Sequence, residues 1–278
     1  QTCALPILQE MRRGGYEFYT GTSYRHLLIH KFGSVVELTA PHDILTKRIG
    51  EYLPQDAVLR EMMETSYRIL SNHPLNLERK AKGLNPANSV WFWGAGTRPM
   101  LTSFEEKYHK KGAMISAVDL LKGIAVGAGL DNIIVEGANG GLHTNYTGKA
   151  EAAVDALAAQ DYDFVYVHIE APDEMGHQGS IPDKIKAIEN IDQKIIGPIV
   201  GELEDLCMDF RTLVLPDHPT PICVRTHTGN PVPYLLYDSR KKAEGMPEYS
   251  ERLGNKSPLF EKEGHRLLSR LFEMDNER

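Results

Sequence analysis

Three short polar clusters, each of which follows or interrupts an apolar run typical of a β-strand, limit what this chain can fold into. They are residues 173–177 (DEMGH), Asp217 with His218 in PDHPTP, and His227 in RTHTG. In α/β proteins polar ligands collect at the carboxyl ends of parallel strands, because the loops of neighbouring strands meet at that edge of the sheet. The clusters therefore predict an α/β fold with one functional site at its strand ends.

The residue types in these clusters favour a metal site. Carboxylates and neutral imidazoles are ligands that borderline divalent ions such as Zn or Mn accept. The five candidate ligands are Asp173, His177, Asp217, His218 and His227. Five ligands supply most of the coordination of two ions. The alternative is that Asp173 caps a helix and the histidines are ordinary polar loop residues, but three clusters occurring together favour the metal site.

The pattern of apolar residues predicts how the larger part of the chain is built. Strand-like runs alternate with segments of helical spacing, and at these lengths the alternation is typical of a mainly parallel sheet with helices on its faces. The predicted strands are residues 89–93 (SVWFW), 133–135, 163–169, 213–215 and 233–238. The predicted helices are residues 113–128, a helix from about 149, a long helix over 182–206, and 265–272.

The N-terminal part has a different pattern. Residues 14–37 alternate aromatic and β-branched residues with polar ones, and residues 56–71 carry apolar residues at helical spacing. These patterns predict a small α+β lobe of strands and one helix. The polar segment 76–88 separates this lobe from the larger part of the chain, and we place the boundary after residue 83.

Three cations are candidates for binding an anionic substrate. Arg98 follows glycines whose amides can approach an anion, although a tight turn with a surface arginine explains the same pattern. Lys122 stands in an otherwise apolar stretch of small residues, so its ammonium either extends to solvent or meets an anion. Arg25 lies in the lobe, where packing or surface exposure is the commoner role of an isolated arginine.

Composition narrows the class of partner and the compartment. The formal net charge of −7 and the lack of a dense basic run argue against a nucleic-acid or anionic-membrane partner. The three cysteines, Cys3, Cys207 and Cys223, have no CxxC spacing and cannot pair evenly, which favours a reducing compartment such as the cytoplasm. No apolar run approaches the roughly 18 residues that a membrane helix needs, and we expect no signal peptide.

The start of the chain has an unusual sequence. Residues 1–7 (QTCALPI) resemble the translation of a sequencing adaptor, and the sequence has no initiating Met. We therefore expect residues 1–7 to be an artefact and the chain to be an N-terminally truncated fragment. The folded part is expected to begin near Leu8.

Seven motifs together point to a known family. They are YRHLL, NPANSVWFWG, ISAVDLLKGIA, HIEAPDEMGH, KAIENID, PDHPTP and RTHTG. With these motifs in this order, the chain from about residue 14 to its end resembles the archaeal-type cofactor-independent phosphoglycerate mutases of the alkaline-phosphatase-like metalloenzyme superfamily. The resemblance implies an alkaline-phosphatase-like core over residues 84–278. Residues 8–83 would be the C-terminal part of an inserted lobe that closes over the substrate.

The resemblance also implies a site and a reaction. Asp173, His177 and His227 would hold one divalent ion and Asp217 with His218 a second, and these ions would be Mn, Zn, Mg or Co. The substrate would be a small phosphorylated molecule, and 2-phosphoglycerate and 3-phosphoglycerate would interconvert through a phosphoserine without 2,3-bisphosphoglycerate as cofactor. Arg98, Lys122 and Arg25 would neutralise the phosphate charge in this reaction.

One part of the family pattern has no counterpart here. The nucleophilic serine and a further metal-binding aspartate of the family come from an N-terminal segment that this sequence does not match, so we assign no catalytic residue. We expect the 278-residue chain to be inactive by itself and its parent protein to be active. Two other functions use the same ligands: a phosphoester hydrolase with an open pocket, and a non-catalytic metal-binding protein.

Overall fold

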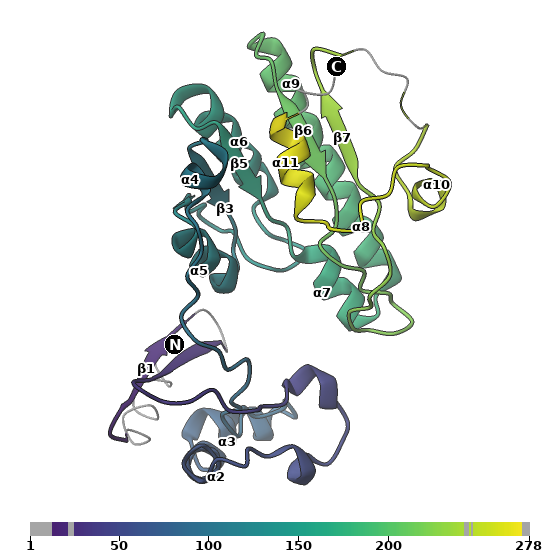
Figure 1. The fold of residues 1–278 in the computed structure, drawn as a ribbon. Coiled ribbons are helices and arrows are strands. Elements are labelled where there is room, and N and C mark those ends of the chain that lie inside the picture. The colour runs from purple at the N-terminus through teal and green to yellow at the C-terminus, as the bar shows by residue number, and fades with distance from the viewer. Residues whose placement is uncertain (1–12, 22–24, 242–244, 246, 274–278) are drawn as a thin grey trace. The chain divides into compact units, whose positions relative to one another are not determined.

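The computed structural model describes residues 13–21, 25–241, 245 and 247–273 (Figure 1). Residues 1–7, including Cys3, lie outside the described residues. The chain forms two compact units, Gln1–Pro99 and Met100–Arg278. The division falls after Pro99 and not after residue 83, because Phe92 is only 9% exposed and packs in the core of the first unit.

The first unit is a small α+β unit. Its two strands pair in antiparallel register, with Tyr16 opposite His30 and Thr20 opposite His26. Its elements are β1 (Tyr16–Thr20), β2 (His26–His30), the 3₁₀ turns η1 (Pro41–Ile44) and η2 (Ile49–Tyr52), α2 (Ala57–Ser71) and α3 (Pro74–Ala81). The predicted helix over 56–71 is confirmed as α2, which begins where the Asp56 side chain accepts hydrogen bonds from two backbone amides.

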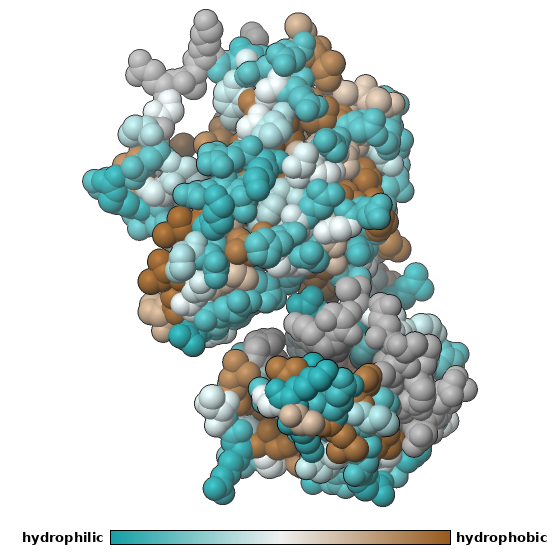
Figure 2. Space-filling model, turned by 180° about the vertical axis from the view of Figure 1, so that it is seen from behind, coloured by the Kyte–Doolittle hydropathy of each residue, from teal (hydrophilic) through white to brown (hydrophobic). Residues whose placement is uncertain are grey.

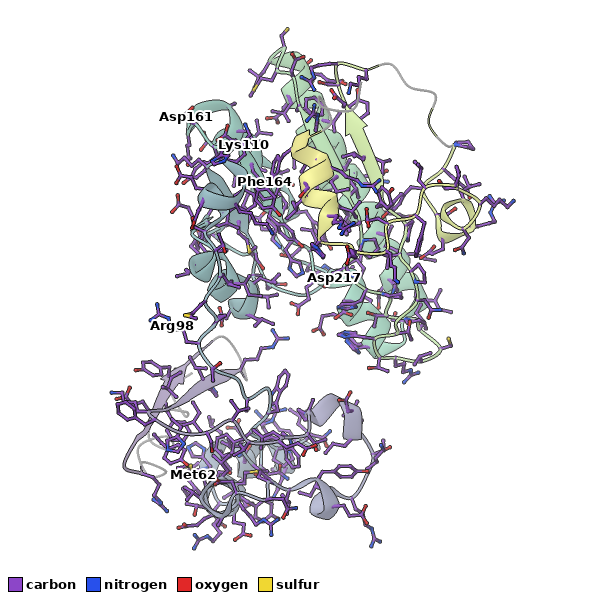
Figure 3. The ribbon with its side chains drawn as sticks, in the orientation of Figure 1. Met62, Arg98, Lys110, Asp161, Phe164 and Asp217 are labelled. Carbon is purple, nitrogen blue, oxygen red and sulfur yellow. The ribbon has the colours of Figure 1, made fainter. Side chains whose placement is uncertain are left out.

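The predicted strand over residues 89–93 is wrong. This segment has no regular secondary structure, and its aromatic residues complete the core of the first unit. Phe92 packs with Met62 and Met63 of α2, and Met62 is labelled in Figure 3. The indole of Trp91 donates to the carbonyl of Thr39 at 2.7 Å. A short apolar run is compatible with a strand or with an irregular core segment, and tertiary packing decided between them.

The second unit contains a parallel sheet with helices packed on it. The strands run in the order β4-β3-β5, and α5 and α6 pack against them. The elements of this part are α4 (Phe104–Tyr108), β3 (Gly112–Ile115), α5 (Asp119–Gly127), β4 (Asp131–Asn132), α6 (Tyr146–Ala159) and β5 (Phe164–Val167). The predicted α/β class, a parallel sheet flanked by helices, is confirmed.

Two sequence predictions within this sheet are wrong. Residues 113–115 were expected at the start of a helix, but they form the central strand β3, all four residues of which are buried. An apolar run buried on both faces has no period-2 signal that separates it from a helix. The strand predicted at 133–135 is displaced to β4, because the ladder ends where the amide of Ile133 donates to Met114 at 2.9 Å, and Ile134 is 71% exposed.

The remainder of the second unit supplies the elements around the candidate site. Its elements are α7 (Ala171–Gln178), α8 (Ile181–Ile191), the π-turn η3 (Asp192–Ile196), α9 (Gly197–Asp205), the antiparallel pair β6 (Arg211–Val214) and β7 (Leu235–Asp238), α10 (Glu251–Gly254) and α11 (Arg266–Glu273). The long helix predicted over 182–206 is confirmed as α8 and α9, joined by the single π-turn. Ala187 and Ile195 of this helical segment pack in the core beside α6 and α7.

The surface mixes hydrophobic and hydrophilic residues. On the face seen in Figure 2, brown patches interrupt a largely teal surface, and exposed apolar side chains include Leu120, Val126 and Ile134. Cys207 and Cys223 are free and exposed. Within the described parts of the chain, every helix is too short or too polar to cross a membrane.

Candidate metal centre

Helix α7 presents two of the predicted ligands on one face. Pro172 occupies the first turn, where it needs no hydrogen-bonding amide, and Gly179 ends the helix with a φ of 72°. Asp173 and His177 are four residues apart, so they lie on the same side of the helix. The Nε2 atom of His177 is 3.3 Å from Oδ2 of Asp173.

The loop after β6 supplies the other three predicted ligands. Asp217 follows the strand end (Figure 3), and its carboxylate accepts the backbone amide of His218 at 3.1 Å and lies 3.2 Å from Nε2 of the same residue. The loop closes on itself, because the amide of Thr228 donates to the carbonyl of Pro219 at 3.1 Å. This closure returns His227 to the neighbourhood of His218, and their ring centroids are 3.7 Å apart.

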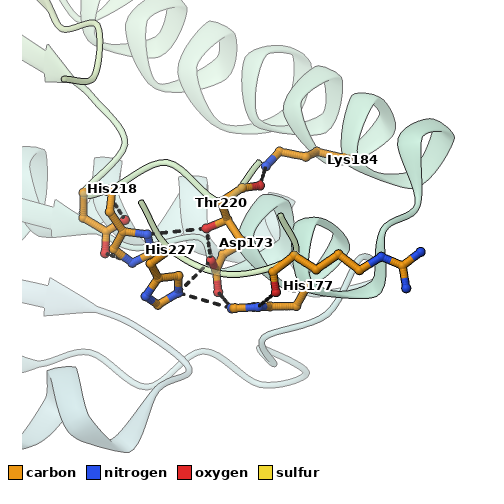
Figure 4. A network of polar contacts seen from close by, with 8 residues as sticks. Asp173, His177, Lys184, His218, Thr220 and His227 are labelled. Atoms are coloured by element: carbon orange, nitrogen blue, oxygen red, sulfur yellow. Dashed lines mark hydrogen bonds and ion pairs between the residues drawn. The ribbon is translucent and has the colours of Figure 1, made fainter. Parts of the chain in front are cut away.

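The side chains of α7 and of this loop converge on one another (Figure 4). The Nε2 atom of His227 is 3.2 Å from both Nε2 of His177 and Oδ1 of Asp173. One ligand atom each of Asp173, His218 and His227 also lies within 4.8 Å of the other two. All of the predicted ligands are therefore in one chain of contacts, with Asp217 joined to it through His218.

The donor set fits a divalent metal ion. Ligand atoms around a tetrahedral zinc ion lie about 3.4 Å from one another, given Zn–N distances of about 2.0–2.1 Å. The contacts among Asp173, His177 and His227 are 3.2–3.3 Å. Two unprotonated ring nitrogens and a carboxylate repel one another at such distances unless a proton or a cation lies among them.

The protonation of His177 suits this role. Its Nδ1 atom is 2.9 Å from the carbonyl oxygen of Arg225, which can only accept, so Nδ1 carries the proton and donates. In the neutral ring Nε2 is then the free acceptor, and a hydrogen bond of this kind orients metal-binding histidines in general. Arg225 adopts a left-handed φ of 59° to present its carbonyl, a backbone strain that clusters at functional sites.

The environment of His227 favours its neutral form. Partial burial, followed by the nearby His218, lowers the pKa of His227. Since a metal ion binds the unprotonated ring, the lower pKa extends the pH range in which His227 can be a ligand.

Residues 23–267 match the metalloenzyme superfamily. The chain belongs to this superfamily. Its relatives include the 2,3-bisphosphoglycerate-independent phosphoglycerate mutases of Methanosarcina barkeri and Methanosarcina mazei, each 50% identical over 86% and 88% of this chain. The chain spans only 62% and 64% of the length of those two relatives.

Two solved structures have a similar fold. A Pyrococcus horikoshii protein is 34% identical with a TM-score of 0.65, and the match covers 80% of this chain and 57% of that one. The cofactor-independent phosphoglycerate mutase of Thermoplasma acidophilum has a TM-score of 0.55 at 24% identity, covering 99% and 70% of the two chains, and this likeness concerns the fold alone.

The three cations predicted to bind substrate belong to different units of the chain, Arg25 and Arg98 to the first and Lys122 to the second. Lys122 lies on α5, and its ammonium is 3.5 Å from Asp119 one turn earlier. Arg98 is exposed and points away from the backbone (Figure 3). Arg25 is exposed in the first unit, just before β2.

A buried lysine beside the strand ends was not predicted from the sequence. Lys149 of α6 is 1% exposed and donates to the carbonyl of His168 at 3.0 Å. Burial lowers the pKa of Lys149 from 10.5 to about 8. Nδ1 of His168 in turn lies 3.4 Å from the hydroxyl of Ser116. The only sequence signal was a lysine in the first turn of an alanine-rich helix, which is common on exposed helices as well.

Proposed function

We propose that this chain is the metal-binding part of a 2,3-bisphosphoglycerate-independent phosphoglycerate mutase, which interconverts 2-phosphoglycerate and 3-phosphoglycerate. The observation that carries the proposal is the convergence of Asp173, His177 and His227 in a sequence 50% identical to relatives of that name. The role of the first unit as a lobe that closes over the substrate stays a prediction.

In this proposal the five ligands hold two divalent ions. Asp173, His177 and His227 bind one ion, and Asp217 with His218 binds the second. The contact between the rings of His218 and His227 supports adjoining sites. When bound, such ions lower the pKa of a coordinated hydroxyl and neutralise charge on a phosphoryl group. Mn, Zn, Mg and Co all accept this mixture of imidazole and carboxylate ligands.

The cations of the chain would orient the anionic substrate. Phosphoryl transfer needs positioning and charge neutralisation more than covalent help from the protein. Lys122 is suited to this work, because its 3.5 Å pair with Asp119 is partly exposed and loose enough for a phosphate to replace. Arg98 and Arg25 would supply further donors, and a guanidinium can hold phosphate through two parallel hydrogen bonds.

Phosphorus NMR of the metal-loaded protein with 3-phosphoglycerate tests the proposal. Because the chain spans 62% of the Methanosarcina barkeri relative, the assay uses a chimera that joins this chain to the part of that relative outside the match. A resonance of 2-phosphoglycerate is the expected result. Inorganic phosphate instead would identify a hydrolase, and bound metal without turnover would identify a non-catalytic metal-binding protein. An Asp173→Asn chimera is the control for background activity.

A further inference from the structure

Thr220 contacts two of the candidate ligands (Figure 4). It is 4% exposed. Its hydroxyl donates to Oδ1 of Asp173, and the same oxygen lies 3.4 Å from Nδ1 of His218. A carboxylate can only accept, so the single hydroxyl proton goes to Asp173 and the oxygen is left to accept Nδ1–H of His218. One side chain thus contacts a ligand on α7 and a ligand on the loop after β6.

The backbone of Thr220 is held from a third element. The ammonium of Lys184, on α8, donates to the carbonyl of Thr220 at 2.7 Å. Helix α7 approaches the same carbonyl through Gly176, where an added Cβ would lie 2.6 Å from that oxygen and 2.9 Å from Cγ2 of Thr220. Only a residue without a side chain fits there, and the threonine is therefore fixed against both α7 and α8.

We infer that Thr220 is a positioning residue for the metal centre, which orients the carboxylate of Asp173 and selects the tautomer of His218. This inference rests on the metal site of the proposed function. With Oδ1 fixed by the hydroxyl, Oδ1 faces His227 and Oδ2 faces His177. With Nδ1–H of His218 donated to the threonine, a neutral ring carries no proton on Nε2, which lies 3.2 Å from Oδ2 of Asp217 and would share an ion with that carboxylate. Removal of the hydroxyl frees both groups to rotate.

Calorimetric titration of the chain with MnCl₂ tests this role. Thr220→Val keeps the shape of the side chain and removes the hydroxyl, and we expect Mn²⁺ affinity to fall about 10- to 100-fold, the usual effect of losing a partner of a metal ligand. Thr220→Ser restores the hydroxyl and should bind within about 3-fold of the unsubstituted chain. The matched control is Thr228→Val, because that threonine is in the same loop and its buried hydroxyl has no hydrogen-bond partner within the described residues. Its affinity should be unchanged.

The outcomes separate positioning from general stability. Thermal unfolding of each metal-free variant is measured alongside, and a positioning role predicts that affinity falls in Thr220→Val while the metal-free Tm stays close to that of Thr228→Val. Unchanged affinity in Thr220→Val, or equal losses in the two valine variants, would overturn the inference. If Thr220→Val does not fold, Lys184→Met carries the test, since it releases the Thr220 carbonyl and should weaken Mn²⁺ binding in the same direction.

The titration also distinguishes this inference from the proposed mutase. It uses Mn²⁺ alone, without phosphoglycerate. One outcome is tight Mn²⁺ binding that depends on Thr220 in a protein that does not isomerise 3-phosphoglycerate. It would contradict the proposed function and support the positioning role. An unsubstituted chain that binds no Mn²⁺ would overturn the positioning role itself.

Discussion

The ligand cluster around Asp173 and the three candidate substrate-binding cations were both predicted from residue types. The two groups differ in how well the surrounding structure orders their side chains. The cluster side chains contact one another at 3.2–3.3 Å across 50 residues of sequence. The cations are exposed or partly exposed, and Lys122 contacts a neighbour on its own helix. The difference lies in how firmly the backbone fixes each side chain.

The cluster residues lie either in the loop after β6 or on the short helix α7, which has Pro172 in its first turn and ends at Gly179. Their side chains are short, and polar partners such as the Arg225 carbonyl hold them. A lysine or arginine has a long side chain with several rotatable bonds, and its charged end orders only when a partner compensates for the lost conformational entropy. Four substitutions test this contrast, and they are given in decreasing order of the change they should cause.

Asp173→Asn should have the largest effect. The NH₂ group that replaces one carboxylate oxygen cannot bind a cation and the negative charge is lost, so we expect metal affinity to fall about 1,000-fold, or about 4 kcal/mol. Calorimetry with MnCl₂ measures it, and Asp205→Asn, at an exposed carboxylate of α9, is the control that should bind as before. Equal affinities in the two variants would show that Asp173 is not a ligand.

Lys149 extends the contrast to a buried cation. Its pKa of about 8 in the folded protein lies below its ordinary value of 10.5, so below pH 8 folding carries the full cost of a buried charge. That cost fades as pH rises from 8 to 10.5, where the unfolded chain binds more protons than the folded one. The free energy of unfolding of the unsubstituted chain, compared with that of Lys149→Met, should therefore rise by about 3 kcal/mol between pH 8 and pH 10.5.

Urea unfolding of both proteins at pH 7 and pH 11 measures this change. Lys122→Met is the matched control, because Lys122 is partly exposed beside Asp119. The difference in unfolding free energy between Lys122→Met and the unsubstituted chain should not show this rise between pH 7 and pH 11. A constant difference between the unsubstituted chain and Lys149→Met at both pH values would show that burial does not lower the pKa of Lys149.

Gly176→Ala tests the close approach of α7 to Thr220. The new methyl group would lie 2.6 Å from the Thr220 carbonyl, so the helix or the loop has to move, and we expect a loss of about 2 kcal/mol in unfolding free energy. Gly201→Ala, in α9 with nothing within 4 Å of its added Cβ, is the control and should stabilise slightly by about 0.5 kcal/mol. Thermal or urea unfolding measures both variants. Equal stability of Gly176→Ala and Gly201→Ala would indicate that the loop moves away from the new methyl group without loss of unfolding free energy.

Substitution of a candidate substrate-binding cation should have the smallest effect on folding. Lys122→Met removes a partly exposed ion pair with Asp119 and should change the unfolding free energy by about 0.5 kcal/mol or less. Mn²⁺ affinity should be unchanged, and 3-phosphoglycerate affinity of the metal-loaded protein should fall. A weakened Mn²⁺ titration in Lys122→Met would place this lysine in the metal centre and remove the contrast.

Errors of prediction occurred where a short apolar run had to be assigned without its surroundings. Residues 113–115 form β3 and not the start of a helix, and residues 89–93 pack irregularly in the first unit. Such runs carry no period that separates a buried strand from a helix or from an irregular core segment. The burial of Lys149 could not be predicted either, since a lysine among alanines also occurs on exposed helix faces.

Short-range preferences in the sequence are enough to predict the local geometry of the candidate ligands. The four-residue spacing of Asp173 and His177 on one helix face, and the strand end before Asp217, follow from propensities that act over a few residues. The three-dimensional fold was needed to show that His227 returns to His177, that Arg225 sets the tautomer of His177, and that Thr220 joins α7 to the loop. Those contacts span about 50 residues of chain, and long-range packing fixes them because no local preference acts over that separation.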